Sequence, residues 1–331
     1  MSRTAAGTTG RPDHESGLPR RTARYRLDPA FGRWKKRLPA TGILLVAMLG
    51  AVGYANRGSA DVARAASGIS AVAGGGGVHE VLPRPAPTPS VLYGANGVPL
   101  AVSNAVAAAG GDTAVAVYDA TSGRSYAYQD SARFKTGSVV KLSILGELLR
   151  RAQEGRTPTA ADQRNALAMI AHSDNDAASD LWDELGRGSA VVGTFDRLVG
   201  TRATTADPGG YLGLTVTTAA DEVMVMRAIA YPNPVLTDSS RAQAVTLLGQ
   251  VESDQRFGAT AGVPPGVEVD VKNGWLPYDE GWYVNTVAHV YGAGRDYVVA
   301  VMSKGGATQQ AGTDRIEQIS AAVWQTAGIR R

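Results

Sequence analysis

The chain has 331 residues, of which 44% are hydrophobic and 19% are charged, and its formal net charge is +3. This composition suits one globular domain of about 220 residues with additional tails. Cysteine is absent, which excludes disulfides, thiolate zinc sites and a cysteine nucleophile.

The positive charge is concentrated at the N-terminus. Residues 1–37 are polar and turn-rich, with ten Lys or Arg against three Asp or Glu. Their local charge is therefore +7, and subtracting it from +3 leaves −4 for residues 38–331. The high pI belongs to this tail, so we expect no nucleic-acid partner. We predict that residues 1–37 form a disordered cytoplasmic tail.

A hydrophobic segment, residues 38–55, follows the basic tail. Its apolar centre, Ile43–Val52, carries no charge and comes soon after Arg33–Arg37. Basic residues before the segment and few after it predict a cytoplasmic N-terminus and an extracytoplasmic C-terminal domain. We expect an uncleaved single-pass membrane anchor. The alternatives are signal cleavage near Gly53–Ala55, which gives a secreted protein, and a buried core helix.

Residues 56–100 are predicted to be a linker. The stretch contains Gly74–Gly77 and then four alternating prolines between Pro83 and Pro89. Glycines make the chain flexible, whereas alternating prolines favour an extended polyproline conformation. Such a linker would hold the domain at residues 101–331 away from the membrane, at the distance needed to cross cell-wall material.

The C-terminal domain is expected to open with a β-hairpin. Asp112–Ala120 and Ser125–Gln129 are rich in β-forming residues, and they flank the turn sequence Thr121–Arg124. This hairpin comes just before the first motif that suggests a chemical reaction.

Ser138 and Lys141 form a Ser-x-x-Lys motif at the start of a predicted helix. The apolar residues that follow recur on one helical face, namely Leu142, Ile144, Leu145, Leu148 and Leu149. A spacing of three lets the amine approach the hydroxyl that it would deprotonate. The amides and the positive dipole end of this turn favour an oxyanion beside Ser138. By itself the motif also fits a capped amphipathic helix.

Two further motifs follow in order. Ser173, Asp174 and Asn175 form Ser-Asp-Asn, which alone also fits an N-cap for a helix at Asp176–Leu185. The third motif, Lys-x-Gly, comprises residues 272–274 and alone also fits a strand end with a glycine turn.

Lys135-Thr136-Gly137 is a decoy for the third motif. It abuts Ser138 on the N-terminal side, whereas the third motif must lie on a strand that faces Ser138 across a cleft. We therefore assign that motif to Lys272.

The remaining elements complete the domain. Val267–Lys272, Trp282–Tyr291 and Asp296–Ser303 are predicted strands, and Asp314–Thr326 is a predicted closing helix. Ser303–Gly306 is expected to form a turn between the last strand and that helix. Strands at both ends with helices between them predict a single α+β domain.

The order and setting of the three motifs resemble the class A β-lactamase and penicillin-binding superfamily. The resemblance covers the chain from about Gly111 to the C-terminus. It includes Met169–Ala178, which is similar to the family's helices on either side of Ser-Asp-Asn. It implies a β-lactamase-like α+β fold, with an antiparallel sheet flanked by helices and a helical lobe.

The resemblance also implies catalytic roles. Ser138 would attack the substrate carbonyl, and Lys141 would take its proton directly or through water. Ser173 would relay a proton to the leaving nitrogen. The backbone amides of Ser138 and Trp275 would form the oxyanion hole.

Substrate-binding roles are implied for the second and third motifs. Asn175 would hold a substrate amide and the Lys141 amine, and Lys272 would hold a substrate carboxylate. Asn273 replaces the hydroxyl residue that the family uses before Gly274, so the contact with that carboxylate is altered.

The family's Glu-x-x-Leu-Asn segment, which activates the water that releases the acyl group, has no match in this chain. Asp207 is the only carboxylate in the corresponding stretch, Arg202–Leu214. It is a candidate deacylating base, and the Asp207-Pro208 sequence is also a plain turn signal.

Three functions remain open. We expect an exported serine hydrolase of the class A β-lactamase type, which is acylated at Ser138 by β-lactams and hydrolyses their amide bond. A penicillin-binding D-Ala peptidase or β-lactam-sensing domain would keep the acyl group longer. An inactive relative would keep the cleft as a binding or scaffold surface.

The expected partners are a small β-lactam or acyl-D-Ala peptide, the membrane through the N-terminal segment, and cell-wall peptidoglycan. We expect a monomer without a cofactor. The four histidines, His14, His79, His172 and His289, form no metal-binding motif, so no metal site is predicted.

Overall fold

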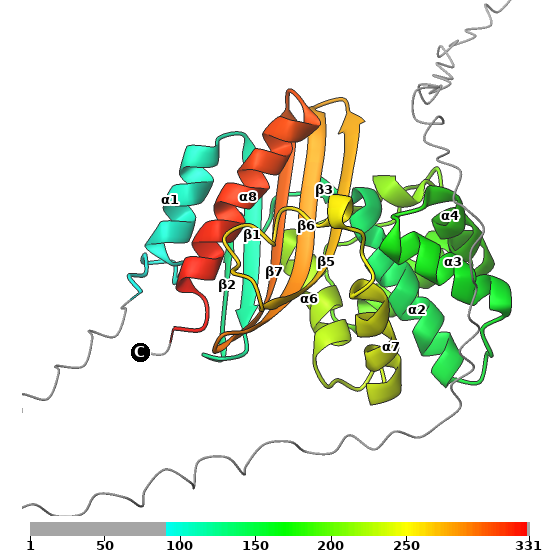
Figure 1. The fold of residues 1–331 in the computed structure, drawn as a ribbon. Coiled ribbons are helices and arrows are strands. Elements are labelled where there is room, and N and C mark those ends of the chain that lie inside the picture. The colour runs from blue at the N-terminus through cyan, green and yellow to red at the C-terminus, as the bar shows by residue number, and fades with distance from the viewer. Residues whose placement is uncertain (1–90, 330–331) are drawn as a thin grey trace, which may run out of the picture. The chain divides into compact units, whose positions relative to one another are not determined.

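A five-stranded antiparallel sheet lies at the centre of the computed structural model, which describes residues 91–329 (Figure 1). The strand order is β2-β1-β7-β6-β5. The strands are β1 (Asp112–Asp119), β2 (Arg124–Tyr128), β5 (Glu268–Tyr278), β6 (Gly281–Gly292) and β7 (Arg295–Gly306). The predicted hairpin and the α+β fold with an antiparallel sheet are confirmed.

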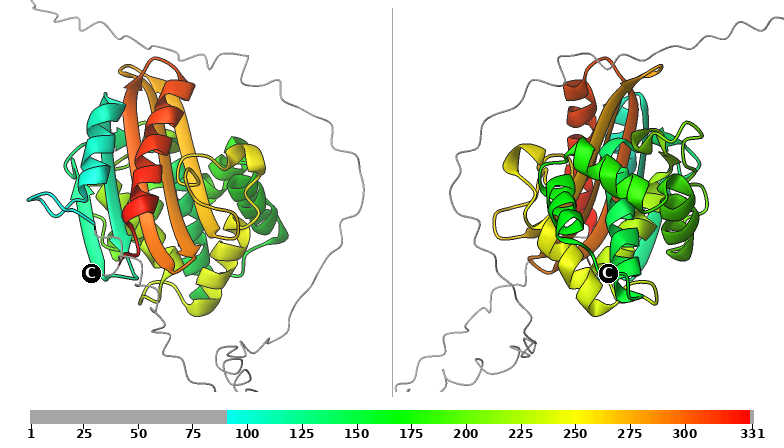
Figure 2. Two further views of the ribbon diagram at one scale, coloured as in Figure 1. Left: turned by 60° about the vertical axis from the view of Figure 1, so that its left-hand side comes forward. Right: turned by 90° about the vertical axis from the view of Figure 1, so that its right-hand side faces the viewer.

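Two helices cover one face of the sheet. These are α1 (Leu100–Ala109) and α8 (Gln309–Thr326), which lie side by side in Figures 1 and 2. The apolar face of α8 is buried against the sheet through Ile316, Ile319 and Val323. The helix starts earlier than Asp314 because the Thr308 side chain accepts a hydrogen bond from the Ala311 amide at 3.1 Å and caps it.

The prediction of a turn at Ser303–Gly306 is wrong. Strand β7 continues to Gly306, where that residue pairs with Trp282 of β6. Lys304 likewise pairs with Asp112 of β1. Cross-strand pairing on both sides overrides the local preference of two glycines for a turn.

Helix α6 (Ala219–Ala230) packs on the opposite face and leads into the helical lobe (Figure 2). The lobe contains α2 (Lys141–Gln153), α3 (Ala160–Ala171), α4 (Asn175–Glu184), α5 (Arg187–Ala190) and α7 (Asp238–Leu248). Short helical turns connect these elements, namely η2 (Gly137–Val140), η3 (Val191–Asp196), η4 (Leu212–Leu214) and η5 (Ser253–Gln255). The predicted apolar face of α2 is buried, so this helix is the core of the lobe.

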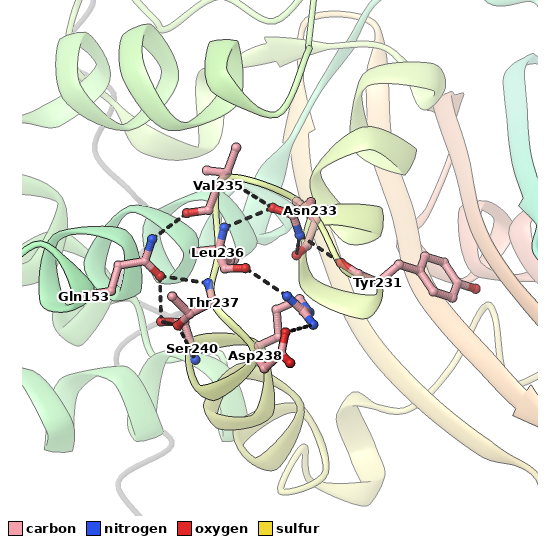
Figure 3. A network of polar contacts seen from close by, with 10 residues as sticks. Gln153, Tyr231, Asn233, Val235, Leu236, Thr237, Asp238 and Ser240 are labelled. Atoms are coloured by element: carbon pink, nitrogen blue, oxygen red, sulfur yellow. Dashed lines mark hydrogen bonds and ion pairs between the residues drawn. The ribbon is translucent and has the colours of Figure 1, made fainter.

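The last residue of α2 fixes that helix to the connection between α6 and α7 (Figure 3). Gln153 Nε2 donates to the Val235 carbonyl at 2.6 Å, and its Oε1 accepts from the Thr237 amide at 3.0 Å. The Ser240 hydroxyl donates to the same Oε1 at 2.9 Å. Asn233 stabilises the turn within this connection, because its Oδ1 accepts a hydrogen bond from the Val235 amide at 2.9 Å. One end of the helix that begins beside Ser138 is thus held by side chains.

A two-stranded sheet holds the other end. Strands β3 (Phe134–Lys135) and β4 (Val216–Thr217) pair antiparallel, and the Thr136 amide donates to the Thr215 carbonyl at 2.9 Å. The chain just before Ser138 is therefore tied to the loop that precedes α6.

Contacts with the domain begin before residue 100. Tyr93 and Pro99 form an isolated β-bridge, and Val98 is fully buried. The predicted tail at residues 1–37, the anchor at 38–55 and most of the linker at 56–100 lie outside the described residues. No helix within residues 91–329 combines the length and the apolar character needed to cross a bilayer.

Candidate active site

Ser138 lies in the short 3₁₀ turn η2, which continues directly into α2. The Lys141 amide donates to the Ser138 carbonyl, so the turn and the helix join without a break. Gly137 has φ +55°, a conformation that a residue with a Cβ adopts only with strain. A Cβ on Gly137 would also lie 2.8 Å from the Trp275 amide nitrogen. Glycine at position 137 therefore lets the turn that carries Ser138, the predicted nucleophile, approach β5.

Gly274 completes this close approach from the other side. A Cβ on Gly274 would lie 2.6 Å from the Ser138 amide nitrogen and 2.6 Å from the Thr136 carbonyl oxygen. The Ser138 and Trp275 amides consequently lie on two backbone segments in direct contact. Two neighbouring N–H groups on such segments suit the stabilisation of a developing oxyanion.

The Lys141 side chain is fully buried. Its Nζ donates to the Ser173 carbonyl at 2.7 Å, to Asn175 Oδ1 at 2.8 Å and to Ser173 Oγ at 3.3 Å. Burial lowers the pKa of Lys141 to about 7, against an opposing effect of the Asp174 carboxylate. A substantial fraction of the amine is therefore neutral near pH 7 and able to accept a proton.

Ser173 lies in the turn between α3 and α4 with φ +52°, which is uncommon for a residue with a side chain. Asp174 fixes that turn, because its Oδ1 accepts from the Ala177 amide at 2.8 Å and caps α4. This turn lets both the carbonyl oxygen and the hydroxyl oxygen of Ser173 accept hydrogen bonds from Lys141 Nζ. Backbone strain of this kind costs on the order of 1–3 kcal/mol and concentrates at functional sites.

Lys272 reaches the same hydroxyl from β5. Its Nζ donates to Ser173 Oγ at 2.9 Å and to the Asn273 carbonyl at 2.8 Å, and the residue is only 1% exposed. Burial, with the nearby Lys141 as a second cause, holds the pKa of Lys272 well below its ordinary value. Both predicted lysines thus meet at Ser173. The decoy Lys135 instead places its Nζ over the Tyr278 ring, 4.6 Å from its centroid.

The side chains of Asn273 and Trp275 alternate with those of Lys272 and Gly274 and so lie on the other side of β5. Asn273 Nδ2 donates to the Gln255 carbonyl at 2.8 Å and to the Phe257 carbonyl at 3.1 Å. Trp275 packs against the Phe257 ring, with a centroid distance of 5.6 Å. The structure therefore ties the predicted substrate-binding side chains at 273 and 275 to a neighbouring segment of the protein.

Asp207 closes its own turn. Its carbonyl accepts from the Gly210 amide at 2.9 Å, and its Oδ2 accepts from the Tyr211 amide at 3.2 Å. The same loop continues to Gly213, which lies beside Gly137. The bonds of Asp207 agree with the turn interpretation of this residue.

Asn285 is a site residue that the sequence did not identify. It is fully buried opposite Gly274 on β6, and its Nδ2 donates to the Lys135 and Thr136 carbonyls at 2.8 and 3.2 Å. It thereby supports the backbone just before Ser138. A polar residue in the middle of an apolar strand, Trp282–Tyr291, was the available signal.

Histidines and carboxylates do not form a metal centre in the part of the chain that the structure describes. No group of three or more such residues there could hold an ion.

Known proteins share this fold. The family model described as "Beta-lactamase enzyme family" matches residues 100–164 and 163–327, so the chain belongs to that family. An ancestral class A β-lactamase (GNCA) is 26% identical, with a TM-score of 0.58 over 68% of this chain and 97% of that chain. The class A β-lactamase from Mycobacterium abscessus is 22% identical, with a TM-score of 0.59 over 68% of this chain and 96% of that one. The chain thus has the fold of a β-lactamase-family serine hydrolase.

Curated relatives are similar over about two thirds of the chain. Proteins named "Putative lipoprotein LppW" from Mycobacterium tuberculosis and Mycobacterium bovis are 29% identical over 232 residues. The match covers 66% of this chain and 72% of each relative.

Proposed function

We propose that this protein is an active-site serine hydrolase that forms an acyl-enzyme at Ser138. The observation that carries this proposal is the buried Lys141, whose pKa is lowered to about 7 three residues after the nucleophile. Burial of a lysine with a lowered pKa does not help to stabilise the fold. A general base, in contrast, is most effective when its pKa lies near the working pH.

Acylation begins when neutral Lys141 accepts the proton of the Ser138 hydroxyl. The Ser138 oxygen bonds to the substrate carbonyl carbon, and the negative charge moves to the carbonyl oxygen between the Ser138 and Trp275 amides. Loss of one such amide donor costs about 3 kcal/mol of transition-state stabilisation. The Asn175 side chain orients Lys141 through its Oδ1 and offers its amide group to the acyl side of the substrate.

Collapse of the tetrahedral intermediate breaks the bond between carbon and the leaving nitrogen. The Ser173 hydroxyl gives its proton to that nitrogen and recovers a proton from protonated Lys141. The hydrogen bond between Lys141 Nζ and Ser173 Oγ supports this relay. Lys272 holds the same hydroxyl in place from the side of β5.

The expected substrates are β-lactams or acyl-D-Ala peptides. A second function, a penicillin-binding peptidase or β-lactam sensor with a slowly released acyl group, is favoured by the bonds of Asp207. Its Oδ2 accepts a hydrogen bond from its own turn, which competes with activation of a deacylating water.

An envelope location agrees with this chemistry. The relative from Mycobacterium tuberculosis is named "Putative lipoprotein LppW", and the hydrophobic segment at residues 38–55 follows a basic tail in this chain. We therefore infer a membrane-tethered monomer whose catalytic domain is outside the cytoplasm, where peptidoglycan peptides are available. Cleavage of the segment would give a secreted form.

Intact-mass measurement of the full-length protein with benzylpenicillin tests the proposal. Ring opening keeps both parts of the drug attached, so the expected adduct equals the whole drug mass and is absent in Ser138→Ala. Rapid loss of the adduct supports a β-lactamase, and persistence supports the peptidase or sensor. An adduct on Ser138→Ala, or neither an adduct nor hydrolysis of the drug with the wild type over hours, would refute acylation at Ser138 by this drug and favour an inactive relative.

A further inference from the structure

A cavity of about 260 Å³ lies where the end of β5 meets the two-stranded sheet. Its walls come from β3 and the residue before it, from β4, from the end of β5 with the turn into β6, and from one residue each of β6 and β7. Phe134 and Tyr283 are the buried part of this lining, whereas Arg133, Asp279 and Glu280 are exposed. The cavity therefore has a closed floor and an entrance from solvent.

Two cations of the cavity are held by neutral partners. Arg133 Nη1 donates to the Ala203 carbonyl, and Lys135 Nζ lies over the Tyr278 ring, 4.6 Å from its centroid. Both side chains line the cavity. Neither a carbonyl oxygen nor an aromatic ring cancels a full positive charge, so both cations can still bind an anion.

The carboxylates of the lining are fewer than the cations, and one of them is already paired. Glu280 Oε2 accepts from Lys304 Nζ at 2.8 Å and from the Tyr283 hydroxyl at 3.0 Å. These bonds hold the pKa of Glu280 below its ordinary value, so the pair with Lys304 stays charged and bonded. Asp279 is the other carboxylate and is exposed in the turn between β5 and β6. Three cations against two carboxylates leave the cavity positive, which suits an anionic group.

The cavity and the candidate active site lie along one face of β5. The strand pairs with β6 without a register shift, so Gly274 and Tyr278, four residues apart, point to the same side. The Ser138 amide approaches Gly274 from that side, and the Lys135 ammonium lies over the Tyr278 ring. The segment from Lys135 to Ser138 thus follows β5 from the cavity to the predicted nucleophile.

The proposed acylation sets the direction of the substrate on this face. Ser173 gives its proton to the leaving nitrogen, and Lys272 of β5 holds that hydroxyl, so the leaving group lies toward Lys272. The acyl part then extends the opposite way along β5, toward Tyr278. Tyr278 follows Trp275, one of the proposed oxyanion donors, by three residues, which is about 10 Å along a strand. An extended acyl chain of about three residues therefore reaches the cavity.

We propose that the cavity binds a carboxylate at the far end of the acyl part of the substrate, with Arg133 and Lys135 as its donors. The substrate class is a peptide acyl donor with a free carboxylate about 10 Å from the reacting carbonyl. Such a carboxylate gains charge-assisted hydrogen bonds from both cations. This inference rests on the proposed acylation of Ser138, and it narrows the acyl-D-Ala peptides expected there to those with an acidic acyl end.

Two matched thioesters test this inference on the full-length protein. One is the succinyl-glycyl-glycyl thioester of mercaptoacetic acid, and the other carries a carboxamide in place of the succinyl carboxylate. The Ser138 oxygen bonds to the thioester carbon, the carbon–sulfur bond breaks, and the leaving sulfur takes the proton. A disulfide reagent detects the released thiol without background, because the chain has no cysteine. The two thioesters share a leaving group, and their uncatalysed hydrolysis rates correct for intrinsic reactivity.

We expect the wild-type protein to favour the carboxylate thioester about fivefold in corrected kcat/KM, since two partly exposed cations bind it. Lys135→Gln and Arg133→Gln should each reduce this preference to about twofold or less. Lys135→Arg keeps the charge over the Tyr278 ring and should retain the preference. Arg164→Gln is the matched control: it removes one positive charge from an exposed position of α3 and should also retain the preference.

The outcomes separate this inference from the proposed function. Equal rates, a preference for the carboxamide, or no thiol release at all, in a wild-type protein that reacts with benzylpenicillin, overturn the inference and leave acylation intact. A preference that persists in both Lys135→Gln and Arg133→Gln places the carboxylate outside the cavity and overturns the inference as well. No thiol release from either thioester, together with neither an adduct nor hydrolysis of benzylpenicillin, rejects the proposed function itself. Reaction with benzylpenicillin shows that a variant is folded, and the wild-type comparison stands even if a variant fails to fold.

Discussion

Lys141 and Lys272 direct their side-chain nitrogens at one oxygen, the Oγ of Ser173, from distances of 3.3 and 2.9 Å. The two amines come from different parts of the chain, the start of α2 and the middle of β5. Both are buried and both have a lowered pKa, so the site disfavours the state in which both are charged. Burial is the largest cause of both shifts, so the neutral Lys141 that the proposed acylation requires follows from its buried position.

The rate of Ser138 acylation should therefore rise with pH with a midpoint near 7. Only the neutral form of Lys141 accepts a proton, and burial lowers its pKa to about 7. Lys141→Met should reduce the acylation rate on the order of a thousandfold. The measurement is the initial rate of adduct formation with benzylpenicillin between pH 5 and 9. A rate that is independent of pH over this range contradicts the role of Lys141.

Asp174→Asn should move that midpoint to a lower pH. The Asp174 carboxylate stabilises the charged form of Lys141, so its removal lowers the pKa of the lysine further. Asparagine keeps the N-cap of α4, because its side-chain oxygen can still accept from the Ala177 amide. Asp176→Asn, in the exposed first turn of the same helix, is the control and should shift the midpoint less. An unchanged or higher midpoint in Asp174→Asn would show that another group sets the pH dependence.

Gly274→Ala should abolish acylation while the fold survives at reduced stability. The added Cβ would lie 2.6 Å from the Ser138 amide nitrogen, so the nucleophile turn must move away from β5. Displacement of the oxyanion donors should cost at least a hundredfold in acylation rate. Gly249→Ala is the control, since a Cβ there meets its nearest atom at 3.5 Å and φ is −64°. Wild-type acylation by Gly274→Ala would show that the close contact is dispensable.

The sequence identified the residues of the candidate site that belong to short motifs because their signals are local. Ser138 and Lys141 are three residues apart, and Ser173 and Asn175 belong to one turn, so short motifs carry them. The hydrophobic periodicity that predicted α2 was equally local.

Two side-chain contacts of the site that depend on distant pairing were not predicted. Asn285 supports the Lys135 and Thr136 carbonyls from about 150 residues away along the chain, and nothing near it in sequence indicates that partner. The contact between Asn273 and residues 255–257 is of the same kind. The wrong prediction of a turn at Ser303–Gly306 also came from missing distant contacts, because pairing with β1 and β6 makes these residues part of a strand.

Asn285→Leu should reduce both stability and acylation. The substitution removes the Asn285 donor from the Lys135 carbonyl and one of two donors from the Thr136 carbonyl, which also accepts from the Val139 amide at 3.3 Å. We expect a cost of about 1–3 kcal/mol. We expect a lower melting temperature and a slower acylation rate at saturating benzylpenicillin. Asn165→Leu is the control: it removes a half-buried amide of α3 whose hydrogen bond to Asp180 Oδ2 is long, at 3.4 Å, and lies at the surface, so it should change neither quantity appreciably. A normal acylation rate in a destabilised Asn285→Leu protein would make this residue structural only.

Glu222 should make the protein less stable as pH rises from about 4.5 to 8. It is fully buried on α6, and burial, followed by the charge of Asp196, raises its pKa to about 8. The native state therefore keeps a proton that the unfolded chain loses above its ordinary pKa of 4.5. The stabilising effect of that proton is complete below pH 4.5 and is lost as pH rises through 8, at about 1.4 kcal/mol per pH unit.

Glu222→Gln should flatten this dependence, since the glutamine has the shape of the protonated acid and no charge to bury. Thermal unfolding of the full-length protein between pH 5 and 9 measures the effect, and the variant should exceed the wild type in melting temperature most clearly near pH 9. Asp196 adds to the loss of stability with rising pH in the wild type, because burial raises its pKa to about 7. A charge on Asp196 also raises the pKa of Glu222. Glu268→Gln, at an exposed position on β5, controls for the loss of one acidic residue and should follow the wild-type curve. Parallel curves for wild type and Glu222→Gln would mean that Glu222 is ionised in the native protein and that its charge is balanced within the core.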